Sequence, residues 1–85
     1  MSIWKEIKNT HVVTDFDKHR EGDIKKLVAI DGYLTDDDNE SGCVIANVLL
    51  TVRGDICVVY ADNRARADAY AQEVIQETIN TIREL

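Results

Sequence analysis

The last third of the chain repeats its apolar residues with the period of an α-helix. Between residues 62 and 85 the apolar positions recur every three or four residues, and charged and amide side chains fill the opposite side. The apolar stripe consists of Ala67, Ala71, Val74, Ile75, Thr78, Ile79, Ile82 and Leu85. An amphipathic helix needs an apolar surface to lie on, so the pattern predicts a helix packed on a sheet.

Three segments before this helix have the composition and length of β-strands. They are rich in β-branched residues and are bounded by polar or glycine-containing turns. The segments are residues 24–35, 43–53 and 56–61, separated by a polar loop at 36–42 and a turn at Gly54-Asp55. We therefore predict an α+β fold class for a single domain of residues 1–85: a three-stranded antiparallel meander packed by one long C-terminal helix.

Turn chemistry also predicts the strand register. A two-residue turn at Gly54-Asp55 sets Leu50 opposite Val59. Centring the other hairpin on the polar loop sets Val28 opposite Leu50. Both hairpins then bring apolar residues to one face, which the C-terminal helix is expected to cover.

The N-terminal segment predicts a short helix over residues 3–8, with Ser2 as its N-cap. Residues 10–16 are rich in β-branched residues and predict a fourth strand at the edge of the sheet.

The predicted second face of the sheet is more apolar than a solvent-facing side should be. The large side chains expected there are Leu27, Tyr33, Ile45, Leu49, Val58 and Tyr60, with Ala29 between them. Two explanations remain open. Residues 1–16 cover this face, or a second copy of the chain or another protein binds to it.

Composition narrows the classes of partner. The 85 residues are 45% hydrophobic and carry a net charge of −6, typical of a small globular domain. Direct nucleic-acid binding is disfavoured, because phosphate contact needs clustered Lys and Arg. The absence of a long apolar segment and of a signal-peptide pattern predicts a cytoplasmic protein with no membrane contact. A basic protein is a reasonable partner for an acidic surface.

The polar loop at 36–42 offers an alternative function. Asp37, Asn39 and Ser41 have the spacing of the first half of an EF-hand calcium loop, which they resemble, but Val48 occupies the position of the bidentate Glu. Weak divalent-cation or small-ligand binding is the alternative function. Arg64 and Arg66 are expected to reach the acids of this loop.

Catalytic motifs are incomplete. The stretch from Val12 to Asp17 resembles the first motif of haloacid-dehalogenase-type phosphatases, but Lys18-His19 occupies the Gly-Thr position of that motif. Cys43 and Cys57 form no CxxC pair and are expected on opposite sheet faces, so we predict no disulfide. The sequence thus favours a non-enzymatic protein-interaction module without a cofactor, with the size and charge of a small acidic regulatory or inhibitor protein of bacterial or mobile-element type.

Overall fold

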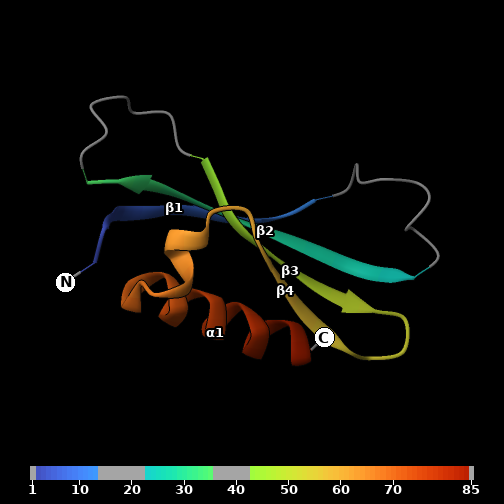
Figure 1. Cartoon of the computed structure of the whole chain (residues 1–85). Helices are drawn as coiled ribbons and strands as arrows, with labels where there is room; N and C mark the ends of the chain where they lie inside the picture. Colours follow the sequence, from blue (N-terminus) through green and yellow to red (C-terminus); the bar gives the residue numbers. More distant parts are fainter. Residues whose placement is uncertain (1, 14–22, 36–42, 85) are drawn as a thin grey trace.

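The computed structural model describes residues 2–13, 23–35 and 43–84, and the description below concerns these residues. One antiparallel sheet has the strand order β1-β2-β3-β4, and a helix lies across one of its faces (Figure 1). The elements are β1 (Trp4–Val12), β2 (Ile24–Leu34), β3 (Cys43–Thr51), β4 (Ile56–Tyr60), the 3-10 helix η2 (Asn63–Arg66) and α1 (Ala69–Arg83). The predicted α+β class, the meander and the C-terminal helix are confirmed.

The N-terminal segment is the edge strand β1, so the helix predicted over residues 3–8 is wrong. Two register shifts interrupt the β1–β2 pairing, one between Trp4 and Glu6 and one between Ile7 and Asn9. Each shift adds one unpaired residue, so Trp4, Ile7 and Thr10 all point to the helix-covered face although they are three positions apart. A spacing of three imitates helical periodicity, which explains the wrong prediction.

The β2–β3 hairpin keeps the predicted faces with a different register. Val28 lies opposite Val48 instead of Leu50, a displacement of two residues. Side chains alternate with a period of two, so an even displacement leaves the side chains from Ala46 to Leu50 on their predicted faces. After Ile30 the β2–β3 pairing contains a register shift, and at this shift the neighbouring residues Ile45 and Ala46 are both fully buried in the core.

The register of the β3–β4 hairpin differs from the predicted register, and the difference moves the side chains of β4 to the opposite face of the sheet. Leu50 lies opposite Ile56 instead of Val59, a displacement of three residues. The Gly54 amide donates to the Thr51 carbonyl at 3.0 Å, and the Thr51 amide donates to the Asp55 carbonyl at 2.9 Å. Gly54 has a φ of 93°. These bonds describe a three-residue loop with glycine at its left-handed position, rather than the predicted two-residue turn.

The predicted C-terminal helix is divided in two. Asp62 caps η2 through the Arg64 amide, and Asp68 caps α1 through the Ala71 amide. Each capping carboxylate satisfies an amide that has no partner within its helix. The buried residues of α1 are Ala71, Ile75, Thr78 and Ile82, which belong to the predicted stripe. They form the core with residues from the sheet, including Trp4, Val28, Ile30, Ile45, Ala46 and Val48.

Candidate interaction surfaces

The open face of the sheet is the face that α1 does not cover. Leu27, Leu49 and Cys57 are paired across β2, β3 and β4, and Ala29, Asn47 and Val59 form the next row. Alternation from these rows places Asp31, Tyr33 and Val44 on the same face. We call these nine residues the open face. Its apolar members range from Ala29, which is 2% exposed, through half-buried Leu27 and Leu49 to Val59, which is 54% exposed.

Three residues predicted for this face lie on the helix-covered side instead. Ile45 is fully buried in the core, and Val58 and Tyr60 pack against the core. The displacement of three residues in the β3–β4 hairpin moves Val58 and Tyr60, and the register shift in β3 moves Ile45. Their predicted placement is therefore wrong, whereas Leu27, Tyr33 and Leu49 are on the expected face.

Cys57, Val59 and Val44 replace them on the open face, where the sequence pattern predicted none of the three. Val44 is 39% exposed, and Cys57 is exposed and free. The signal that could have found Cys57 and Val59 is the glycine at position 54, because a single glycine after two non-glycine residues also fits a three-residue loop. That loop gives the observed register.

The open face carries a polar contact between described residues at its β1 side. His11 Nδ1 lies 3.5 Å from the Asp31 carboxylate, and the two side chains are 44% and 21% exposed. Exposed pairs of this kind contribute little to stability, about 0–1 kcal/mol. The pair makes this side of the face polar, so the apolar part is concentrated over β2, β3 and β4.

A groove of about 620 Å³ separates β1 from α1 on the helix-covered side. Its sheet wall includes Ile7, Thr10, Val12 and Val28, and its helix wall includes Val74, Glu77, Thr81 and Ile82. At one end the Ile7 amide donates to the Tyr70 hydroxyl at 3.4 Å, which joins β1 to α1. The sequence pattern did not predict this groove, because it predicted a helix where β1 lies.

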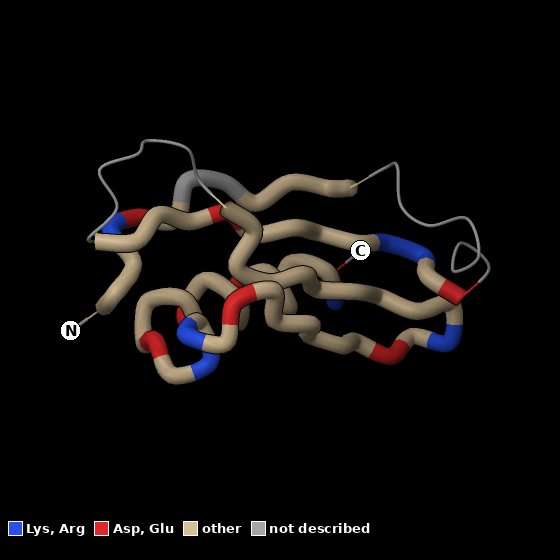
Figure 2. The backbone as a smooth tube through the Cα atoms, turned by 45° about the horizontal axis from the view of Figure 1, so that its top comes forward, with Lys and Arg blue, Asp and Glu red and all other residues tan. Residues whose placement is uncertain are grey.

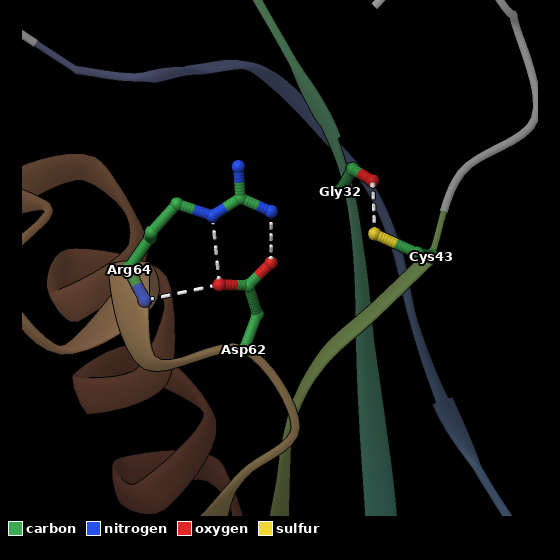
Figure 3. Close-up of polar contacts among 4 residues, drawn as sticks. All are labelled: Gly32, Cys43, Asp62 and Arg64. Carbon is green, nitrogen blue, oxygen red and sulfur yellow. Dashed lines mark hydrogen bonds and ion pairs between the residues drawn. The ribbon is translucent and has the colours of Figure 1, made fainter.

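Residues 36–42 lie outside the described residues, and with them the candidate cation ligands Asp37, Asn39 and Ser41. The arginines expected to reach this loop have other contacts. Arg64 pairs with Asp62 at 2.6 Å (Figure 3), and the guanidinium of Arg66 lies 5.1 Å from the centre of the Tyr60 ring. The hydrogen bond from the Arg64 side chain lowers the pKa of Asp62. Cation binding by the loop stays a prediction.

Charges in the described part of the chain are dispersed. Lys and Arg occur at several separate places, many of them close to Asp or Glu (Figure 2). Within residues 2–13, 23–35 and 43–84, no three His, Cys, Asp or Glu side chains gather where they could hold a metal ion. No helix of this part is long and apolar enough to cross a membrane.

Comparison with known proteins adds no relative from which a function could be transferred. The chain matches no family model, no curated protein and no solved structure. The functional argument therefore depends on the two surfaces just described, the open face and the groove.

Proposed function

We propose that this chain is a non-enzymatic protein-interaction module that binds a second copy of itself or another protein through the open face. The observation that carries the proposal is the one-sided coverage of the sheet. The helix α1 lies on one face, while Val59 and Val44 remain 54% and 39% exposed on the other, beside Leu27, Leu49 and Cys57. A solvated sheet face is normally polar, and contiguous exposed apolar residues are typical of binding surfaces.

Val59 is the residue best suited to test this surface. Its side chain is mostly exposed, so Val59→Asp introduces a charge on the open face without placing it in the core. Val52→Asp is the matched control, because Val52 is 59% exposed but lies in the turn between β3 and β4. The two variants have the same change in charge and in side-chain size.

Light scattering over a concentration series measures self-association. We expect the wild-type chain and Val52→Asp to dimerise and Val59→Asp to remain a monomer with an unchanged circular dichroism spectrum. A dimer that survives Val59→Asp would show that the open face is not the interface. A wild-type chain that stays monomeric at every concentration would rule out self-association through this face.

A further inference from the structure

We propose that the groove between β1 and α1 binds an extended segment of another protein, with alternating apolar and basic side chains, which adds to the free edge of β1 as a further strand. This site is separate from the open face and does not depend on the function proposed above. The inference combines three observations: the direction of the β1 backbone groups, the lining of the groove and its charge.

The first observation is that β1 has a usable edge. In the described residues β2 is the only strand next to β1. The Val13 amide donates to the Leu27 carbonyl at 2.8 Å, so residues 13 and 27 form a hydrogen-bonded pair. Bonded and non-bonded pairs alternate in an antiparallel ladder. The backbone groups of Val12 and Thr10, opposite Val28 and Ile30, therefore point away from β2 and can bind an added strand.

The second observation is that the same two residues line the groove. Thr10 is exposed and Val12 is 49% exposed. On paired strands, residues directly opposite one another place their side chains on the same face. A segment that bonds to Val12 and Thr10 would thus direct alternate side chains toward the helix wall at Val74 and Thr81. Backbone bonds at a strand edge combined with side-chain pockets beside it are the general basis of strand addition.

The third observation is the charge at the helix wall. Glu77 is exposed and is the only acidic residue among the described residues that line the groove. The whole chain also carries a net charge of −6. Two basic residues are also among the described lining residues, and both belong to the sheet wall: His11 contacts Asp31 on the open face at 3.5 Å, and Lys26 belongs to β2. A Lys or Arg side chain of the added segment would therefore meet Glu77 and be attracted by the whole molecule.

The probe is a short acetylated and amidated peptide in which valine and lysine alternate, compared with one in which valine and glutamate alternate. Fluorescence anisotropy gives the affinity of each, and amide hydrogen exchange by NMR locates the contact. We expect the lysine peptide to bind more tightly and to slow exchange at Thr10 and Val12. Equal affinity for both peptides, or unchanged exchange at these two amides, would overturn the proposal.

Variants test the charge and the edge separately. Glu77→Lys should weaken binding of the lysine peptide about tenfold, because an attraction becomes a repulsion. Glu73→Lys is the control, since Glu73 is exposed on α1 with the same charge but is not part of the lining. Val12→Pro removes one outward amide and should weaken binding about tenfold, the value of one typical hydrogen bond. If Glu77→Lys and Glu73→Lys behave alike, no specific contact at Glu77 exists and the proposal fails.

A second copy of the chain is the competing occupant of the edge. If the wild-type chain is a dimer that Val12→Pro converts to a folded monomer, β1 pairs with β1 of a second copy, and the peptide proposal is wrong. Val59→Asp separates this site from the open face. We expect it to leave the affinity for the lysine peptide unchanged, whatever it does to self-association.

Discussion

At the scale of single residues, Asp68 makes the most consequential polar contacts of the described chain. Its carboxylate is 4% exposed and accepts from the Ala71 amide at 2.9 Å, the Ile3 amide at 2.7 Å and the Ser2 hydroxyl at 2.9 Å. It therefore caps α1 and also holds the segment that leads into β1. One side chain thus connects parts of the chain that lie far apart in sequence.

Replacing Asp68 should lower the free energy of unfolding, because the groups that donate hydrogen bonds to its carboxylate would lose their acceptor. Asp68→Ala removes a helix cap and leaves the Ile3 amide without its acceptor, so we expect a loss of about 3 kcal/mol in the free energy of unfolding. Urea denaturation measures this loss. Asp62→Ala is the comparison, since Asp62 caps η2 with only local partners. A loss at Asp68 no larger than that at Asp62 would contradict the connecting role.

The same contacts predict a dependence on pH. Burial alone raises the pKa of Asp68, but the hydrogen bonds from Ala71, Ile3 and Ser2 outweigh burial and bring it below its usual value. The unfolded chain therefore binds the proton more readily. The stabilisation is complete above the unfolded pKa of about 3.9 and is lost as pH falls through the lower folded value.

Thermal melts from neutral to strongly acidic pH test this dependence. We expect the melting temperature of the wild-type chain to fall in acid, and that of Asp68→Asn to fall less, because asparagine has no carboxylate to protonate. If melting temperature falls with pH at the same slope in the wild-type chain and in Asp68→Asn, other carboxylates dominate acid unfolding.

At the scale of elements, turns and bulges decide which side chain reaches which face. The sequence predicted the three later strands and the apolar stripe of the helix correctly, because each depends on periodicity within one segment. The prediction from the sequence was wrong where one extra residue in a strand or a turn changes which face the side chains reach. The bulges in β1 made a strand resemble a helix, and the three-residue loop at Gly54 exchanged the faces of β4. No local pattern fixes the bulges, since they are stabilised by pairing with the neighbouring strand, and the single glycine at position 54 fits both a two-residue and a three-residue loop.

Substitutions at Gly54 test directly whether this residue has the left-handed conformation of a three-residue loop. With a φ of 93°, Gly54 adopts a conformation that L side chains rarely occupy, and an added Cβ would meet no atom within 4 Å. Gly54→Ala should therefore cost about 1–2 kcal/mol through backbone strain alone. Gly54→Asn should cost less, because asparagine tolerates this region better. Equal losses in urea denaturation would argue against a left-handed residue at this position.

At the scale of the whole molecule, β1 is the element whose attachment matters most, because it borders the groove and because β2 is its only neighbouring strand among the described residues. It is held by its pairing with β2, by the Asp68 contacts and by Trp4. Trp4 is 2% exposed and belongs to the core, and its Cε3 lies 3.1 Å from the position of a Cβ added at Gly32. Detaching β1 would thus expose Trp4 to water, while α1 and the other strands could keep their backbone structure.

Trp4 is the only tryptophan, so its emission reports specifically on β1. With one shared core, we expect tryptophan fluorescence and far-ultraviolet circular dichroism to give the same denaturation midpoint. Asp68→Ala should lower both midpoints together. A fluorescence change that precedes the loss of circular dichroism would mean that β1 opens first as a separate unit. An edge that opens in this way would be a poor template for an added strand, because binding would first have to restore β1 to the sheet.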